Sequence, residues 1–256
     1  MTDAAAPHVT ALYRYPVKGL TPEQLGEVHL APGQTVPGDR IYAVENGAGR
    51  FNPDEPKHLP KINFLMLMRN ERLATLDTHF EDETQTLTIL RDGKQVARGQ
   101  LSTKLGRSMI EQFLAAYMKA DLRGAPHIVT APGHAFTDKA EKCVHIINLA
   151  SVRELERISG RSIDPLRFRP NIIVDGLPVW SELNLVDKAI TIGPVRLEVF
   201  TRTQRCDATN VDPATGTRDM AIPALLQRTL EHTDFGVYAT VTSPGTIRPG
   251  DAVSDG

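Results

Sequence analysis

Frequent turn residues limit the length of the regular elements that this chain can form. The sequence contains 19 Gly and 18 Pro among its 256 residues. Both residues interrupt helices and long strands, so the sequence favours many short strands over a helical bundle. Hydrophobic residues make up 41% of the chain and charged residues 23%, proportions that supply a sizeable core.

Short runs rich in β-branched and aromatic residues predict strands in the first half of the chain. The pair Asp92-Gly93 between two of these runs is typical of a tight hairpin turn. Residues 62–68 fit a strand and a helix equally well. The predicted strands cover residues 8–17, 26–31, 40–45, 73–80, 85–91 and 95–101.

Residues 103–119 switch to a helical period, with apolar side chains on one face and Thr103 suited to cap the helix. The run Gly124-Ala125-Pro126 then breaks the pattern. We therefore predict a first domain of residues 1–122 and a second domain of residues 123–256.

The second half of the sequence also predicts a mixture of short strands and helices. Residues 151–160 predict a helix, with Ser151 and Glu154 spaced as a capping box and Gly160 as its stop. A second helix covers residues 223–230. Predicted strands cover residues 145–148, 171–174, 189–192, 195–201 and 236–242. Two barrel-like units with a few helices, a mixed and β-rich α+β fold, account for this pattern.

Charge and cysteine content exclude several classes of protein. The formal net charge is −2, so we expect no nucleic-acid partner. Two cysteines cannot build a disulfide framework, a four-thiolate zinc site or a plant-type iron–sulfur cluster. The N-terminus lacks the pattern of a signal peptide, and no apolar run is long enough to cross a bilayer. We therefore expect a soluble, cytoplasmic protein without membrane contact.

Residues 201–216, which follow a predicted strand, contain the residues best suited to chemistry. There Cys206 stands directly after Arg205, and cationic neighbours favour the thiolate over the thiol. A thiolate is a nucleophile or a ligand for a soft metal. A small apolar cysteine at a strand end is the alternative interpretation.

Three further segments carry cations near glycine or proline. Arg167-Phe168-Arg169-Pro170-Asn171 precedes a predicted strand, and arginine makes bidentate contacts to phosphate. Tyr15-Pro16-Val17-Lys18-Gly19 and Gly38-Asp39-Arg40 each place one cation beside glycine, where a ligand can approach the backbone. Taken singly, each segment also fits an ordinary turn or a solvated pair of charges.

Together and in this order, the four segments resemble the MOSC family, the C-terminal domain of molybdenum-cofactor sulfurases and their relatives. The arrangement is most similar to the amidoxime-reducing component and its bacterial counterparts, and it spans nearly the whole chain. The resemblance implies an N-terminal β-rich MOSC_N-type domain packed on a MOSC β-barrel. It also implies a molybdenum cofactor, a molybdopterin, in a basic cleft between the two.

The resemblance assigns roles to individual residues. Cys206 matches the cysteine that ligates molybdenum, and Lys18, Arg40 and Arg169 match residues that hold the phosphate and the pterin. Four further positions complete the implied site. They are Thr203 and Arg205, which flank the ligand, Asn171, which positions the cofactor, and Asp212, a positioning residue and a candidate proton donor beside Asp207.

The sequence departs from the family pattern in two places. Gly19 stands where a serine often follows the lysine, and Asp207 stands where relatives often carry an aliphatic residue. Cys143 matches no motif and is interpreted as structural. Neither an iron–sulfur cluster nor pyridoxal phosphate is expected, so electrons would come from a separate protein of the ferredoxin or cytochrome b5 type.

Three functions follow as hypotheses. The first is a molybdenum-dependent reductase of small N-hydroxylated compounds, such as hydroxylamines, amidoximes and N-hydroxylated bases. The second is a non-enzymatic carrier or sulfur-handling module for the cofactor. The third is a metal-free enzyme with Cys206 as nucleophile. The sequence leaves the physiological substrate and the oligomeric state open.

Overall fold

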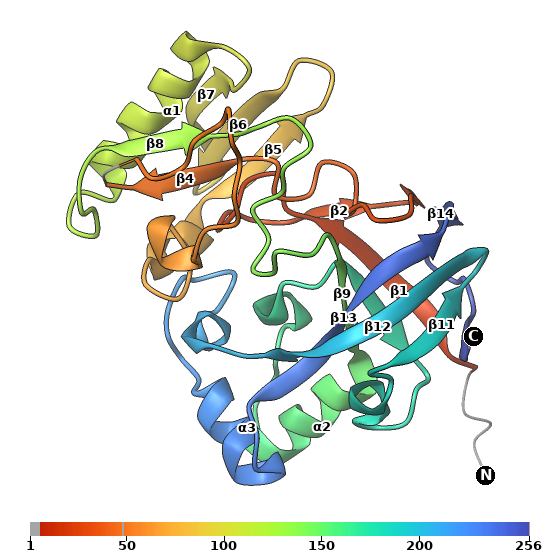
Figure 1. The fold of residues 1–256 in the computed structure, drawn as a ribbon. Coiled ribbons are helices and arrows are strands. Elements are labelled where there is room, and N and C mark those ends of the chain that lie inside the picture. The colour runs from red at the N-terminus through yellow and green to blue at the C-terminus, as the bar shows by residue number, and fades with distance from the viewer. Residues whose placement is uncertain (1–5, 48, 256) are drawn as a thin grey trace.

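The computed structural model describes residues 6–47 and 49–255, and these residues form a β-rich fold with three α-helices (Figure 1). The α-helices are α1 (Lys104–Tyr117), α2 (Leu149–Ser159) and α3 (Ile222–Leu230). The first lies at one end of the molecule, and the other two lie at the opposite end. The mixed, β-rich α+β fold predicted from the sequence is confirmed.

The largest sheet has eight strands in the order β15-β11-β12-β13-β9-β10-β1-β2. Only β9 and β10 run parallel, and every other neighbouring pair is antiparallel. An isolated bridge between His8 and Ala252 links the start of β1 to the chain before β15. The strands are β1 (His8–Arg14), β2 (Glu23–Leu25), β9 (Val144–Asn148), β10 (Ile172–Asp175), β11 (Lys188–Ile192), β12 (Val195–Gln204), β13 (Asp234–Ser243) and β15 (Val253–Asp255).

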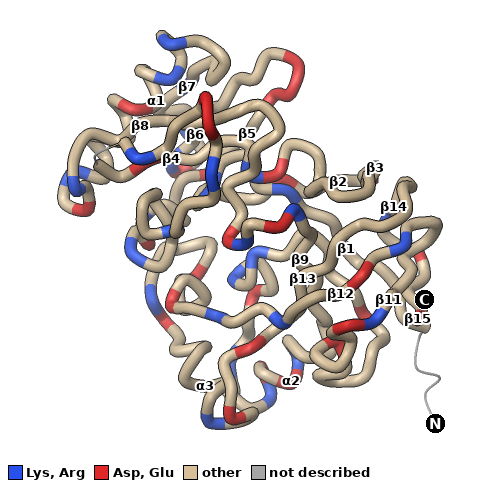
Figure 2. Tube along the Cα trace, in the orientation of Figure 1, with Lys and Arg blue, Asp and Glu red and all other residues tan. Residues whose placement is uncertain are grey.

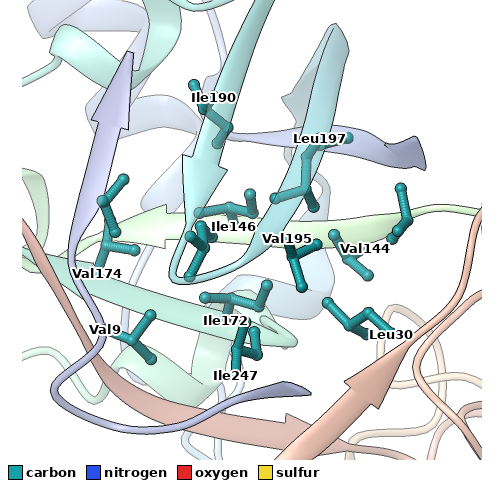
Figure 3. Packing of buried hydrophobic residues seen from close by; sticks show 14 of the residues in the cluster. Val9, Leu30, Val144, Ile146, Ile172, Val174, Ile190, Val195, Leu197 and Ile247 are labelled. Carbon is teal, nitrogen blue, oxygen red and sulfur yellow. The ribbon is translucent and has the colours of Figure 1, made fainter. Parts of the chain in front are cut away.

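The inner face of this sheet holds the main hydrophobic core. Along β12, buried Leu197 and Val199 alternate with exposed Arg196 and Glu198, as the two-residue period of a strand dictates. Figure 3 shows side chains from several strands pointing toward one another in this core. Its labelled members include Val9, Leu30, Ile146, Ile172, Ile190, Leu197 and Ile247.

A smaller unit packs beside the large sheet (Figure 1). It contains a three-stranded sheet covered by α1, with its own core of residues such as Ile89, Ile110 and Leu114. Its strands are β5 (Asp77–Glu81), β6 (Thr86–Arg91) and β7 (Lys94–Gln100). Two short pairs complete the sheets, β3 (Val28–Leu30) with β14 (Gly245–Ile247) and β4 (Ala43–Asn46) with β8 (Pro126–Val129).

Strands from before and after residue 122, the predicted domain boundary, pair with each other in the same sheets. β1 pairs with β10 in the large sheet, with β2 on the other side of β1, and β4 pairs with β8. Five 3-10 helices occur in the connections of the described residues. They are η1 (Lys61–Asn63), η2 (Glu71–Thr75), η3 (Pro165–Phe168), η4 (Ser181–Asn184) and η5 (Asp207–Asn210).

Several local predictions are confirmed. Asp92 and Gly93 both have positive φ, 52° and 71°, and they join β6 to β7 as a hairpin. The Thr103 hydroxyl accepts a hydrogen bond from the Gly106 N–H and caps α1. Gly160 ends α2 with a left-handed φ of 66°.

The predicted capping box of α2 is wrong. The helix begins at Leu149, and the Asn148 side chain caps it by accepting from the Ala150 N–H. Ser151 lies inside the first turn, where its hydroxyl donates to the buried carboxylate of Glu182 at 2.9 Å. The Ser151 side chain, which the local pattern assigned to the helix cap, therefore binds Glu182, a residue far away in the sequence.

Close packing of α1 on β7 leads to a stability prediction. A Cβ at Gly106 would lie less than 3.0 Å from the backbone of Gln100. Gly106→Ala is therefore expected to destabilise the protein by about 1–3 kcal/mol through overpacking, although alanine in an open helix is stabilising. Urea unfolding of Gly26→Ala gives the control, because a Cβ there meets nothing within 4 Å. Equal stability of the two variants would contradict the prediction.

Candidate functional site

A cavity lies where the smaller unit meets the large sheet, with an empty volume of about 830 Å³ that includes its opening to solvent. Five cations and one carboxylate are among the described residues that line it, so the cavity carries a strong excess of positive charge. Figure 2 shows both Lys or Arg and Asp or Glu positions along the chain where the smaller unit meets the large sheet. The charged lining residues are Lys18, Arg40, Lys61, Asp138, Arg169 and Arg205.

Two of these cations contact the same tyrosine ring. The guanidinium carbons of Arg40 and Arg169 lie 4.6 and 4.1 Å from the ring centroid of Tyr15, which is fully buried. Both arginines have left-handed backbone, with φ of 52° and 53°, a conformation that non-glycine residues seldom adopt. Such strained residues cluster at functional sites.

Neighbouring residues explain how the chain holds both arginines. The buried Asp39 carboxylate accepts from the Tyr15 N–H at 2.8 Å and from the Arg40 guanidinium. Burial alone would lower the pKa of Arg40, but the interactions with Asp39, Tyr15 and Tyr238 together outweigh burial and raise that pKa. Arg169 ends η3, whose first turn is capped by Asp164, and burial lowers the pKa of Arg169 to about 10.

Lys18 is held deep in the wall. Its ammonium donates to Asp138 Oδ1 at 2.5 Å and to the Phe136 carbonyl at 2.8 Å. Burial lowers the pKa of Lys18. Burial would raise the pKa of Asp138, but Lys18 and Lys61 outweigh it and hold that pKa below its usual range. One of the three ammonium N–H groups of Lys18 stays available to a ligand.

Gly19 fits the wall only as glycine. Its φ is 86°, and a Cβ there would lie 2.8 Å from the Leu65 carbonyl oxygen. The local backbone therefore requires glycine at this position, where the family pattern led us to expect serine.

The two cysteines occupy different environments. Cys206 follows β12, is partly exposed, and accepts a hydrogen bond at Sγ from the Lys61 ammonium at 3.4 Å. Cys143 also lines the cavity but is buried, and burial raises the pKa of its thiol to about 12. A thiol with that pKa stays protonated at neutral pH, which agrees with a structural role for Cys143.

His145 on β9 links two of the arginines. The guanidinium of Arg205 donates to the Phe168 carbonyl at 2.7 Å and lies 3.4 Å from Nε2 of His145. The Nδ1 atom of His145 lies 3.3 Å from the Arg169 carbonyl oxygen. Because guanidinium only donates, Nε2 is the acceptor and Nδ1 carries the proton.

The buried position of His145 predicts a pH dependence of stability. Burial, followed by the charge of Arg205, lowers the pKa of His145 well below its ordinary value of 6.5. The unfolded chain therefore binds more protons than the folded protein below about pH 6.5, so stability is complete above that pH and falls as the pH drops. In urea unfolding at about pH 7.5 and 5.5, His145→Gln is expected to lose less stability than the wild type. Equal losses would contradict this assignment.

Three buried polar atoms in the cavity wall have no hydrogen-bond partner within the part of the chain that the structure describes. They are Nη2 of Arg169, Nε of Arg205 and the Thr203 hydroxyl. Buried donors are normally satisfied, so each points to a ligand group that accepts hydrogen bonds. Two of the three belong to cations, which favours an anionic ligand.

Asn171 and Asp212 have mainly architectural contacts. Asn171 accepts from the His145 N–H at 3.1 Å and donates to the Tyr13 carbonyl at 3.2 Å, which joins β9 to β1 at the cavity wall. Asp212 does not line the cavity. Its carboxylate accepts from the Thr215 N–H at 2.8 Å and pairs with Arg167 at 3.0 Å. This placement favours a structural role for Asp212.

The structure thus brings most of the predicted site together. Lys18, Arg40, Arg169, Asn171, Thr203, Arg205 and Cys206 all line one cavity. Sequence reasoning missed Lys61, Asp138, His145 and Tyr238, which also line it. Of these four residues, only His145 had a local sequence feature that could have indicated a place in the site, because it starts a predicted buried strand.

Two family models cover nearly the whole chain. The MOSC domain model matches residues 125–254, and the MOSC N-terminal beta barrel domain model matches residues 6–123. The chain belongs to the MOSC family. Both halves of the cavity wall, with Lys18 and Arg40 in one match and Arg169 and Cys206 in the other, are therefore parts of a MOSC protein.

Curated relatives of this MOSC chain are longer proteins. Mitochondrial amidoxime-reducing component 1 of Mus musculus is 32% identical over 120 residues, which cover 42% of the chain and 35% of the mouse protein. Molybdenum cofactor sulfurase of Drosophila ananassae is 25% identical over 195 residues, which cover 70% of the chain and 25% of that protein. The chain thus spans about a third or less of the length of these relatives.

Solved structures similar to this MOSC chain include the YuaD protein from Bacillus subtilis, with a TM-score of 0.45 and 12% identity over 97% of the chain and 94% of YuaD. YiiM from Geobacillus stearothermophilus has a TM-score of 0.36 and 21% identity over 46% of the chain and 55% of YiiM.

Within the described residues, none of the helices has the length and the apolar composition that crossing a membrane requires.

Proposed function

We propose that this MOSC protein binds a molybdenum cofactor and reduces N-hydroxylated compounds such as hydroxylamines and amidoximes. The observation that carries the proposal is a partly exposed thiol, that of Cys206, in a cavity lined by five cations and one carboxylate. The similarity to a protein named amidoxime-reducing component supports the reaction class.

The residues of the cavity fit the chemistry of such a cofactor. A molybdopterin carries a phosphate, which suits the unpartnered donors of Arg169 and Arg205. Its metal is soft enough to take a thiolate ligand. Among the described residues, no group of three or more His, Cys, Asp or Glu side chains could hold a metal ion. A metal at Cys206 would therefore take further ligands from outside the chain, as the dithiolene of the cofactor provides.

Each part of the wall then has a task. Cys206 would ligate the metal, while Lys18, Arg40 and Arg169 would hold the phosphate and the pterin by charge-assisted hydrogen bonds. The bound cofactor supplies two-electron redox chemistry, and the protein supplies orientation and electrostatics. In the overall reaction, an N–OH group takes up two electrons and two protons and becomes N–H, and the oxygen leaves as water.

The electrons would come from a separate donor protein of the ferredoxin or cytochrome b5 type. The chain has two cysteines, of which Cys143 is buried, whereas an iron–sulfur cluster needs four ligands. The sequence also lacks a dinucleotide-binding fingerprint. We therefore propose that reduced nicotinamide alone does not drive the reaction.

The proposal is tested with protein purified from a host that makes the cofactor. We expect about one molybdenum per chain by elemental analysis. We also expect reduction of benzamidoxime with reduced viologen as donor and none with reduced nicotinamide alone. Protein that contains molybdenum but reduces neither amidoximes nor hydroxylamines with viologen would overturn the reductase function.

A carrier of the cofactor is the second candidate. The match to molybdenum cofactor sulfurase, which covers 70% of the chain, favours it over other binding functions. A carrier would pass its cofactor to an apo-enzyme and would show no turnover with viologen. Activity of the recipient enzyme after mixing therefore distinguishes the two candidates.

A further inference from the structure

Lys61 differs from the other cations of the cavity in its position. It lies on η1, and its side chain is 34% exposed, against 7% for Lys18. Among the described lining cations, it is the one that donates a hydrogen bond to Cys206 Sγ, at 3.4 Å. A molecule that enters from solvent toward the sulfur therefore meets the ammonium of Lys61.

The charge of Lys61 is only partly balanced. Its nearest carboxylate oxygen is Oδ2 of Asp138, at 3.6 Å, and the same carboxylate binds Lys18 at 2.5 Å through Oδ1. One carboxylate thus serves two ammonium groups. The carboxylate of Asp207, beside Cys206 in the chain, bonds to Asn210 and does not line the cavity.

Asp138 is the one carboxylate among the described residues that line the cavity, and Met66, Leu67 and Met68 are apolar residues of its lining. In apolar surroundings, the electrostatic interaction between a fixed charge and the charge of an entering molecule is stronger than in water. The ammonium of Lys61 therefore acts on an entering molecule with little screening.

We infer that Lys61 is a specificity-determining residue that favours substrates with a negative charge near the reacting N–O group and disfavours cationic substrates. This inference rests on the proposed reductase function. Selection of this kind combines attraction of one class with repulsion of the other. Lys61 is the most exposed cation for which both a hydrogen bond to the sulfur and a place in the cavity wall are seen.

The first test needs no activity and uses the thiol of Cys206 as a probe. Protein with Cys143→Ala, purified from a host that does not make the cofactor so that Cys206 is free of metal, is treated with two methanethiosulfonate reagents, one with a sulfonate group and one with a trimethylammonium group. The ratio of their rate constants reports the local potential. In Lys61→Met, the ratio of anionic to cationic rate is expected to fall roughly tenfold, and Lys61→Arg should restore it.

Lys57→Met is the matched control. Lys57 stands four residues before Lys61, is exposed and pairs with Glu55 at 2.7 Å. This variant should leave the ratio unchanged. A ratio that is the same in Lys61→Met and Lys57→Met, with circular dichroism like that of the wild type, would overturn the inference.

The second test uses turnover of the loaded enzyme. Benzamidoxime is compared with its para-carboxylate and para-trimethylammonium derivatives. The wild type should have a higher kcat/KM for the carboxylate than for the ammonium compound, and Lys61→Met should reduce this preference roughly tenfold. Absence of turnover with all three compounds, together with absence of turnover with hydroxylamines, would overturn the reductase function. Turnover with an unchanged preference would overturn the role of Lys61 alone.

Discussion

Cys206→Ser is expected to abolish molybdenum binding and reductase activity while the fold stays intact. A serine hydroxyl is a poor ligand for a metal that takes thiolate. Even outer-shell partners of metal sites change affinity by about 10- to 100-fold, so loss of the ligand itself should exceed roughly 100-fold. The Cys206 side chain contacts Lys61 and is partly exposed, so its replacement leaves the core unchanged.

Cys143→Ala provides the control for this variant, because Cys143 lines the same cavity but is buried as a protonated thiol. Molybdenum content and viologen-linked activity should match the wild type in Cys143→Ala and disappear in Cys206→Ser. Urea unfolding should show that both variants are folded. Full molybdenum content in Cys206→Ser would refute the ligand assignment.

Removal of the Arg169 side chain is expected to have the second largest effect. A charge-assisted hydrogen bond contributes about 1.5–3 kcal/mol, so Arg169→Ala should weaken cofactor retention roughly 10- to 150-fold. Arg169 also has a left-handed φ of 53°. Alanine at that position keeps about 1–2 kcal/mol of backbone strain, which glycine relieves.

The pair Arg169→Ala and Arg169→Gly therefore separates charge from backbone. Cofactor content after gel filtration should be low in both variants, whereas the free energy of unfolding should be higher for the glycine variant. Arg153→Ala is the control, since Arg153 is exposed and pairs with Asp175 outside the cavity. If Arg169→Gly retained the cofactor and Arg169→Ala lost it, backbone strain and not the missing guanidinium would explain the loss of cofactor in the alanine variant.

The sequence predicted the part of the site that lies in local patterns. Lys18 stands before Gly19 and Arg169 before Pro170, and Arg40 and Arg169 have positive φ at sharp changes of chain direction. Asp138 and His145 come from segments without such a pattern, and Lys61 follows Pro60 but belongs to none of the four segments that carry the family resemblance. Only packing of the smaller unit on the large sheet places Lys61 beside Cys206, so no local spacing indicates it.

The fold was predictable to a similar extent. Strands of at least five residues, such as β12 and β13, show a pattern that spacing can identify. β2, β14 and β15 have three residues each, which is too short for a period of two to stand out. Asn148 caps α2 in place of the predicted box because Glu182, 31 positions away from Ser151, binds the serine hydroxyl.

The excess of cations over carboxylates in the cavity wall links the lifetime of the protein to the anionic ligand that we propose. Burial lowers the pKa of Lys18, Arg169 and Arg205, which means that their charges weaken the folded state when no anion is bound. A ligand that binds only the folded state adds stability in proportion to the logarithm of its concentration. Resistance to proteolysis should therefore rise with the supply of cofactor. Cells that cannot make the cofactor should contain less of this protein at the same rate of synthesis.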